Sequence, residues 1–240
     1  KTGGILSKLD KKTFPTKAIE HSVPDWLAGL FEKELGVKWE KEMSALNEQA
    51  PVILRANSLK ISAENLVEIL KEEGVNSFVL RGYPDAVQLE EKKNVFLTSA
   101  FKEGFFEVQD ASSQKIAELL DVKEGMRVVD ACAGAGGKTL HIAALMKNKG
   151  QIIALDIYEW KLAELKRRAK RAGAFNIETR FIEDNKVIKR LHNTADRLLI
   201  DAPCSGLGVL KRNPDSKWKI DEDFINRIKI EQENILQNYS

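Results

Sequence analysis

The sequence predicts an α/β fold, in which a doubly wound parallel sheet follows a small α+β module. Two observations favour the sheet. From residue 127 onward, short apolar segments alternate with longer amphipathic ones, and two of the apolar segments run directly into unusual loops, at 130–139 and 201–208. Parallel strands joined by right-handed crossovers form a single sheet. Ligands bind such sheets at the carboxyl edge, so the two loops are the candidates for a functional site.

The composition is that of a globular protein of one or two domains. Of the 240 residues, 43% are hydrophobic and 31% are charged, and the net charge is only +2, so any basic footprint for a nucleic acid has to be local. Two cysteines, no secretory segment and no long apolar span predict a reduced, cytoplasmic protein that does not enter a membrane. The cysteines and histidines lack metal-ligand spacing, so we expect no metal site. We also expect a monomer.

Residues 1–48 are predicted to form an N-terminal tail and a helical lead-in. Residues 1–20 carry several lysines and little apolar periodicity, which is typical of a solvated accessory segment. Between residues 25 and 46 the apolar spacing predicts helix, with Gly36 as a C-terminal stop.

Residues 49–109 are predicted to form the small α+β module. Short strands are expected at 52–56, 78–80, 86–89 and 105–108, and a helix capped by Ser62 follows the first of them. Some basic residues of the module are candidates for phosphate contacts, although each alone also fits a solvated surface charge. These candidates are Arg55, Lys60, Arg81 and Lys102.

Residues 110–240 are predicted to hold the parallel sheet. Asp110 should cap a first helix, after which strands are expected near 127–131, 151–156, 177–182 and 197–201, with helices near 138–147, 158–172 and 185–191. Helix 158–172 should bury one apolar face and direct its basic residues to solvent, although a path along an RNA backbone stays open. Those basic residues are Lys161, Lys166, Arg167, Arg168, Lys170 and Arg171.

The segment 197–206 is expected to deliver an acid and a thiol to the edge of the sheet. Its apolar run suits a strand covered on both faces, and Pro203 ends any strand ladder because it has no N–H to donate. Asp201 and Cys204 then lie where ligands bind in open α/β sheets. The alternative is a structural aspartate beside an inert cysteine, which for Asp-x-x-Cys alone is the commoner case.

The glycine- and alanine-rich loop at 130–139 is suited to a nucleotide-like ligand, because it has little side-chain bulk and opens a helix. Gly137-Lys138-Thr139 match the end of a phosphate-binding P-loop, but Cys132 stands where the first glycine is needed. Asp156 ends the next strand, at the position where nucleoside-binding folds hold ribose hydroxyls. The loop therefore favours S-adenosylmethionine, a nucleoside cofactor without a phosphate, while a P-loop-like ATPase stays an alternative.

Taken in order, these motifs resemble the Sun family of RNA 5-methylcytosine methyltransferases. The resemblance rests on residues 130–139, 154–156, 201–208 and 212–218, and upstream on 50–60 and 104–114. It covers residues 22–240. Gly134-Ala135 is one departure, since the family usually has Ala-Pro there. The resemblance implies a Rossmann-like, S-adenosylmethionine-dependent methyltransferase sheet at 110–240, an RNA-binding-like module at 49–109, and RNA as partner, with rRNA favoured over tRNA.

The resemblance also implies roles for individual residues. Cys204 would help to release the product. From its position, Asp201 is placed to stabilise the charge that builds near N3 of the cytosine ring. Lys211 and Arg212 are further RNA candidates because they lie only a few residues beyond Cys204. The family's attacking cysteine lies in a later Thr-Cys-Ser segment that these 240 residues do not contain, so we expect them to lack the last strands and to bind without turnover. Two alternatives are that Cys204 itself attacks, and that the chain is a non-catalytic RNA-binding relative. The implied cofactor contacts are Cys132, Ala133, Gly134, Ala135, Gly136, Gly137, Lys138, Asp156, Asp184 and Asp201.

Overall fold

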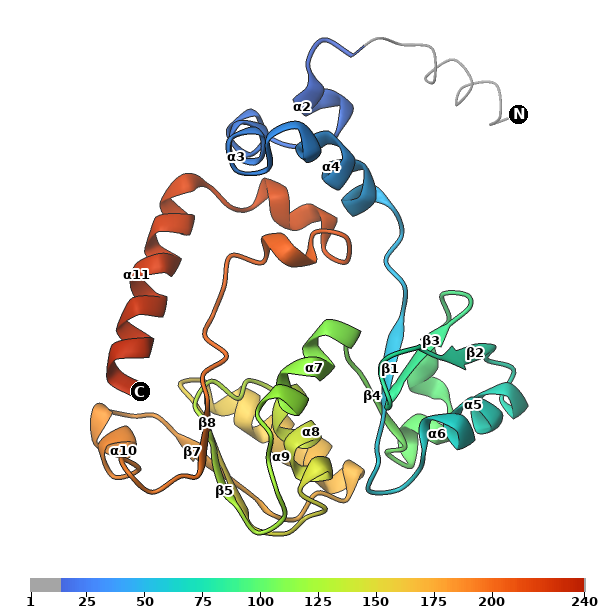
Figure 1. Ribbon diagram of the computed structural model, residues 1–240, viewed down its shortest axis with the longest axis vertical. Coiled ribbons are helices and arrows are strands. Elements are labelled where there is room, and N and C mark those ends of the chain that lie inside the picture. Colours follow the sequence, from blue (N-terminus) through green and yellow to red (C-terminus); the bar gives the residue numbers. More distant parts are fainter. Residues whose placement is uncertain (1–13, 240) are drawn as a thin grey trace. The chain divides into compact units, whose positions relative to one another are not determined.

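The computed structural model describes residues 14–239, which divide into two compact units (Figure 1). The first unit joins residues 14–50 to residues 204–231. The second joins residues 51–203 to the last residues of the chain, up to 239. The predicted tail at 1–20 lies largely outside the described residues.

The first unit consists of helices. Its core contains Trp39 and Met43 of one helix, and Gly36, with φ +55°, ends the helix before it, as predicted. Lys217 is buried and donates a hydrogen bond to Asn47 Oδ1 over 3.1 Å, which ties the segment after residue 204 to the N-terminal helices. The elements are α2 (Lys17–Glu20), α3 (Asp25–Leu35), η1 (Gly36–Lys38), α4 (Trp39–Asn47), η3 (Leu207–Val209), η4 (Pro214–Trp218) and α11 (Glu222–Tyr239), whose last residues belong to the second unit.

The second unit begins with an antiparallel sheet of strand order β2-β3-β1-β4. One face of this sheet packs on α5 through apolar side chains that include Leu54, Leu66 and Phe106. Ser62 caps α5 by accepting a hydrogen bond from the Asn65 N–H, as predicted. The elements are β1 (Ile53–Ala56), α5 (Ala63–Glu72), β2 (Ser77–Val79), β3 (Ala86–Leu89), η2 (Val95–Leu97), α6 (Ser99–Lys102) and β4 (Phe106–Val108).

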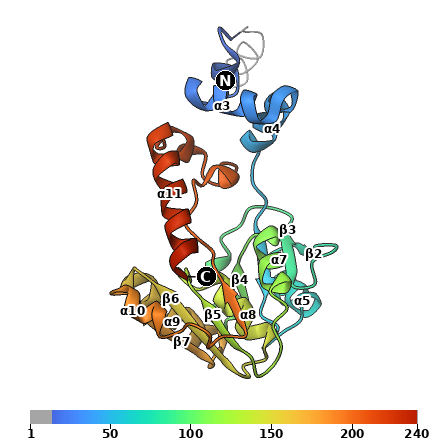
Figure 2. The ribbon, with the colours of Figure 1, turned by 60° about the vertical axis from the view of Figure 1, so that its left-hand side comes forward.

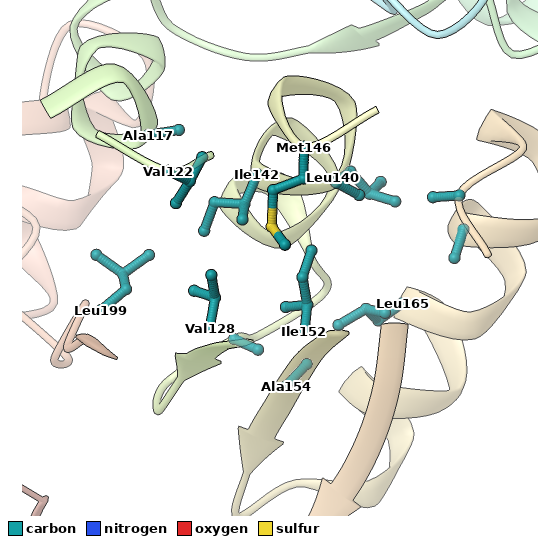
Figure 3. Close-up of a cluster of buried hydrophobic side chains, with 14 of the residues drawn as sticks. Ala117, Val122, Val128, Leu140, Ile142, Met146, Ile152, Ala154, Leu165 and Leu199 are labelled. Atoms are coloured by element: carbon teal, nitrogen blue, oxygen red, sulfur yellow. The ribbon is translucent and has the colours of Figure 1, made fainter. Parts of the chain in front are cut away.

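The same unit continues into a parallel sheet of order β7-β6-β5-β8, which confirms the predicted fold class. Strands β5, β6 and β7 are labelled in Figure 2. Alternate residues of β5 and β6 face opposite sides. Val128 and Ile152 pack with α8 and α9 in one apolar cluster (Figure 3), whereas Val129 and Ile153 pack towards α10. The elements are α7 (Ala111–Leu119), β5 (Arg127–Asp130), α8 (Gly137–Leu145), β6 (Gln151–Asp156), α9 (Glu159–Ala172), β7 (Ile177–Phe181), α10 (Asn185–Lys189) and β8 (Arg197–Leu199).

The strand order places a topological switch point between β5 and β8. The chain proceeds from β5 through β6 to β7 on one side and then returns to add β8 on the other side of β5. Loops that follow β5 and β8 therefore diverge at the carboxyl edge and leave room for a ligand between them. Both loops singled out in the sequence begin at this point.

The predicted strand at 197–201 is shorter and less covered than expected. It ends at Leu199, and in the described part of the chain it pairs with β5 alone, so it is an edge strand. The Leu198 side chain is 37% exposed, which contradicts the expected burial on both faces. A short apolar run has the same sequence pattern in a central strand and in an edge strand, so the sequence could not separate the two.

The predicted exposure of the basic face of α9 is wrong at two positions. Arg168 and Arg171 both form ion pairs with the buried carboxylate of Glu107 on β4, and their side chains are only 17% and 20% exposed. Arg55 is wrong as a candidate phosphate contact for a similar reason, because it is 3% exposed in the centre of β1. Helical and strand periodicity cannot show that a charged face meets another part of the chain.

Candidate cofactor site and reactive loop

The loop that joins β5 to α8 is shaped by glycine conformation and by backbone hydrogen bonds. Gly136 has φ +88° at the N-cap of α8, and a Cβ there would lie 2.6 Å from Cγ of Leu165. The Ala133 N–H donates to Leu155 O over 2.8 Å, and the Gly136 N–H donates to Ala133 O over 2.9 Å. Gly134 has φ +55°, and a Cβ there would have no neighbour within 4 Å. The loop is thus closely packed at Gly136 and open at Gly134.

Asp156 lies at the end of β6 and anchors this loop. Its Oδ2 accepts a hydrogen bond from the Gly134 N–H, and its Oδ1 accepts one from the Tyr158 N–H, both over 2.8 Å. The residue is buried. Since each carboxylate oxygen has two acceptor sites, each oxygen can still accept a hydroxyl hydrogen. The predicted ribose acid is therefore also the residue that positions the loop.

Asp130 at the end of β5 is a site residue for which the sequence analysis proposed no role. Its Oδ2 accepts a hydrogen bond from Thr139 Oγ over 2.7 Å, and both side chains are buried. Burial raises the pKa of Asp130 to about 6, although the Thr139 hydroxyl opposes the shift by stabilising the ionised form. The bond joins the strand to the first turn of α8 beneath the loop.

An ion pair connects the two loops across the switch point. Lys138 Nζ lies 2.6 Å from Asp201 Oδ2, with the lysine side chain 18% exposed and the aspartate 49% exposed. Lys138 belongs to the first turn of α8, and Asp201 follows β8. The structure therefore brings together the two predicted loops through one residue from each.

Two arginines from outside the loop donate hydrogen bonds to its carbonyl oxygens. Arg55 Nη1 donates to Gly137 O, and Arg168 Nη1 donates to Ala135 O, each over 2.7 Å. The sequence pattern predicts both arginines at the surface, where the structure does not place them. One signal was available: Arg55 interrupts an otherwise apolar strand segment, a position at which a charge is rare unless it is paired.

The remaining predicted residues are less closely joined to the loop. Asp184 caps α10 by accepting a hydrogen bond from the Lys186 N–H over 2.8 Å, so it has a structural role whether or not it contacts a cofactor. Cys132 is half-buried in the loop. Cys204 is exposed and is the first residue of the 204–231 segment of the first unit.

A cavity of about 250 Å³ lies on the α10 side of the parallel sheet. It is lined by Val129 and Leu155 from the strands, by Ala131 of the loop after β5, by Ile188 from α10 and by Tyr239. The cavity therefore adjoins the start of the predicted cofactor loop, although its lining does not include Asp156, Asp201 or the loop glycines. Among residues 14–239, no three metal-ligating side chains gather in one place. Over the same range, no helix combines the length and the apolar character that crossing a membrane requires.

Comparison with known proteins identifies the family. A model of the family described as 16S rRNA methyltransferase RsmB/F matches residues 117–240, and a model of a ferredoxin-like domain of RsmF/B-like methyltransferases matches residues 23–96. The predicted methyltransferase sheet and the small module that precedes it thus correspond to domains of known RNA methyltransferases.

Individual relatives agree with these matches. The ribosomal RNA small subunit methyltransferase B of Proteus mirabilis is 35% identical over 88% of this chain and 50% of its own length. The probable ribosomal RNA small subunit methyltransferase B of Bacillus subtilis is 36% identical over 98% of this chain and 55% of its own length. The crystal structure of PH0851 is 31% identical and superposes with a TM-score of 0.89, over 98% of this chain and 55% of that one.

The chain spans about half the length of the curated relatives it matches. Over that span, the fold, the order of the motifs and the similarity to these relatives agree, and the predicted resemblance to the Sun family is confirmed. The chain belongs to the RsmB/F family of 16S rRNA methyltransferases.

Proposed function

We propose that this protein methylates carbon 5 of a cytosine in ribosomal RNA, with S-adenosylmethionine as the methyl donor and a covalent cysteine adduct as the intermediate. One observation carries the proposal beyond family membership. The acid of the Asp-Ala-Pro-Cys segment is joined to the glycine loop by the Lys138–Asp201 pair, over 2.6 Å, at the switch point of the sheet. A cofactor bound at the loop and a cytosine ring bound near Asp201 would then lie next to each other.

The loop fits S-adenosylmethionine better than a triphosphate. Open space beside Gly134 leaves room for a ligand against the backbone, and Asp156 keeps acceptor capacity for ribose hydroxyls. The Asp156 carboxylate also takes up the Gly134 N–H, which a P-loop would present to a phosphate, and adds a negative charge that repels one. Lys138, the lysine that would reach the phosphates in a P-loop, is paired with Asp201. These contacts disfavour the ATPase alternative.

The chemistry needs a thiol because carbon 5 of cytosine is a weak nucleophile. Addition of a thiolate to carbon 6 forms a C–S bond and moves an electron pair onto carbon 5. Carbon 5 would use this electron pair to form a bond to the methyl group of S-adenosylmethionine, whose methyl–sulfur bond would break and leave S-adenosylhomocysteine. Loss of the carbon 5 proton to a base then returns an electron pair to the ring and expels the thiolate. Asp201 would stabilise the charge that develops at N3 during the addition.

We assign Cys204 to the release step, as the resemblance implies, with the cysteine of a Thr-Cys-Ser segment as the attacking group. The chain contains two cysteines, Cys132 and Cys204, and neither lies in such a segment. The competing assignment, in which Cys204 itself attacks, uses the same exposed thiol. Monomeric state and cytoplasmic location stay predictions.

The cofactor part of the proposal is tested by calorimetric titration of the 240-residue chain. S-adenosylhomocysteine should bind, whereas ATP should give no heat of binding. Binding of ATP alone would restore the ATPase reading. Methyl transfer is tested with a chain that also carries the family's Thr-Cys-Ser segment, supplied with RNA of the small ribosomal subunit and tritiated S-adenosylmethionine. Label recovered outside carbon 5 of cytosine would refute the proposed position.

The role of Cys204 is tested with RNA that contains 5-fluorocytosine, which lacks the proton needed for release and therefore traps a covalent adduct. With S-adenosylmethionine present, the 240-residue chain should give no adduct on a denaturing gel. An adduct that forms and is abolished by Cys204→Ser, while Cys132→Ser leaves it intact, would overturn the release assignment.

A further inference from the structure

The antiparallel sheet of the small module has a polar face that is buried inside the second unit. Register places Arg55 on β1 directly opposite Ala86 on β3 and Glu107 on β4. Their neighbours Leu54, Val87 and Phe106 point to the other face and form the apolar core against α5. Arg55 and Glu107 are 3% and 4% exposed, and Ala86 is fully buried. The face that bears them is thus covered by protein.

The covering elements belong to the cofactor-loop region. Glu107 pairs with Arg168 over 2.8 Å and also with Arg171, and both arginines lie on α9. The guanidinium of Arg168, which pairs with Glu107, also donates a hydrogen bond to Ala135 O, and Arg55 donates one to Gly137 O. Arg55 also donates to the side chain of Gln109. A chain of charge-assisted hydrogen bonds therefore leads from the module to the loop.

The two carbonyl groups that accept these hydrogen bonds belong to Ala135 and Gly137. They lie on either side of Gly136, the N-cap residue of α8. Peptide units are planar, so fixing the direction of a carbonyl also fixes the direction of the next N–H. The bond from Arg55 to Gly137 O thereby orients the Lys138 N–H, which lies in the first turn of α8, where N–H groups have no acceptor within the helix. Such N–H groups are the donors that a helix N-terminus offers to a ligand.

Burial and charge keep this arrangement rigid. Burial lowers the pKa of Arg55 to about 10, and the negative charge of Glu107 partly opposes this shift. Because the pKa still lies well above 7, the guanidinium stays protonated at neutral pH. Removing one charged side chain from a buried network leaves the charges of its partners buried and unpaired, which is destabilising. Asn57 adds a second connection, because its side chain donates to Gly104 O and to Ala172 O at the end of α9, each over 2.8 Å.

We infer that Arg55 and Glu107 are positioning residues for cofactor binding: the small module holds the glycine loop in shape through its polar sheet face. This face is consequently not a surface on which RNA bases stack, although sheet faces are used in that way by RRM-type modules. The inference rests on the proposed function only in that the loop is taken to bind S-adenosylmethionine.

The test compares Arg55→Met and Arg55→Lys in the 240-residue chain, with Arg190→Met as the control, because Arg190 is an exposed arginine of the same unit to which no part in the site or in RNA binding is assigned. S-adenosylhomocysteine is titrated by calorimetry. Arg55→Met should weaken its binding by about ten- to a hundredfold, the range for hydrogen bonds to a charged group. Arg55→Lys keeps a charged donor and should recover part of that loss, whereas Arg190→Met should bind as the parent does.

A second readout follows the loop itself, without cofactor. In chains labelled with ¹⁵N glycine, the amide resonances of Gly134, Gly136 and Gly137 should shift in Arg55→Met and in Glu107→Gln, and remain in place in Arg190→Met. If Arg55→Met does not fold, the same spectra of Arg55→Lys and Glu107→Gln decide.

The outcomes separate the inference from the proposed function. Unshifted loop resonances together with unchanged cofactor affinity would overturn the inference. So would an Arg55→Met variant that loses affinity for an unstructured RNA oligonucleotide while it binds cofactor normally. If the parent chain binds no S-adenosylhomocysteine, the proposed function fails, whereas shifted resonances would still establish that the module holds the loop.

Discussion

Replacing Asp130 by asparagine should increase the free energy of unfolding at neutral pH, and the increase should become smaller as the pH is lowered. Asp130 is buried, and its pKa is raised to about 6 from 3.8, chiefly by desolvation. In the folded state the carboxyl group therefore keeps its proton over a pH range in which the unfolded chain has lost it. Because the folded pKa is the higher one, stability from this group is complete below pH 3.8 and is lost as the pH rises to about 6.

The size of the effect follows from the shift. A difference of about two pKa units corresponds to about 3 kcal/mol, at about 1.4 kcal/mol for each unit. Asparagine has no carboxyl group to ionise, and its side-chain oxygen can still accept the Thr139 hydroxyl hydrogen. Relative to the parent, Asp130→Asn should thus gain up to about 3 kcal/mol of unfolding free energy between pH 4 and pH 7, and little above that.

Urea unfolding followed by circular dichroism at several pH values between 4 and 8 measures this difference. Thr139→Val provides an internal check. Loss of the hydroxyl donor removes the largest contribution that lowers the pKa of Asp130, so the fall in stability should extend to higher pH. A free-energy difference between the parent and Asp130→Asn that stays constant across the range would refute the reasoning.

Three further predictions concern the loop, the fold and RNA. Asp156→Ala removes two hydrogen bonds and the expected ribose acceptor, so S-adenosylhomocysteine should bind about ten- to a hundredfold more weakly in calorimetry, and unchanged affinity would exclude the ribose assignment. Gly104→Ala would place a Cβ 2.1 Å from a backbone oxygen, so its melting temperature should fall far more than that of Gly82→Ala, which has open space at a similar φ; equal losses would argue against the close approach. Neutralising Lys211 and Arg212 together should flatten the salt dependence of RNA binding by about one to two units of slope, and an unchanged slope would remove both from the RNA path.

The sequence was informative wherever local pattern and loop chemistry determine structure. Alternating apolar segments predicted the parallel sheet, and capping residues such as Ser62 and Asp110 marked helix starts that the structure confirms. The acid at the end of β6 was placed correctly beside the glycine loop, because the strand–loop–helix order fixes both at the same edge of the sheet.

The misplaced residues are those whose partners lie far away in the chain. Arg55 contacts Gly137, and Arg168 pairs with Glu107, across 82 and 61 positions respectively. A basic residue on a periodic helix or strand has the same local pattern whether it meets water, RNA or a buried carboxylate. Only the packing of the module against α9 decides among these possibilities.

This packing changes where an RNA path can be sought. Arg55 is buried and donates to Gly137 O of α8, and the Lys60 ammonium donates to the carbonyls of Glu103 and of Arg171 on α9. Two of the four basic candidates in the module are thus engaged in contacts within the second unit. Arg81 and Lys102 stay exposed. Since the net charge of the whole chain is only +2, the proposed RNA binding would have to rest on a few exposed cations and not on a general positive field. Charge removal at single exposed residues should therefore reduce binding measurably, whereas the same change at Arg55 should act through the cofactor loop.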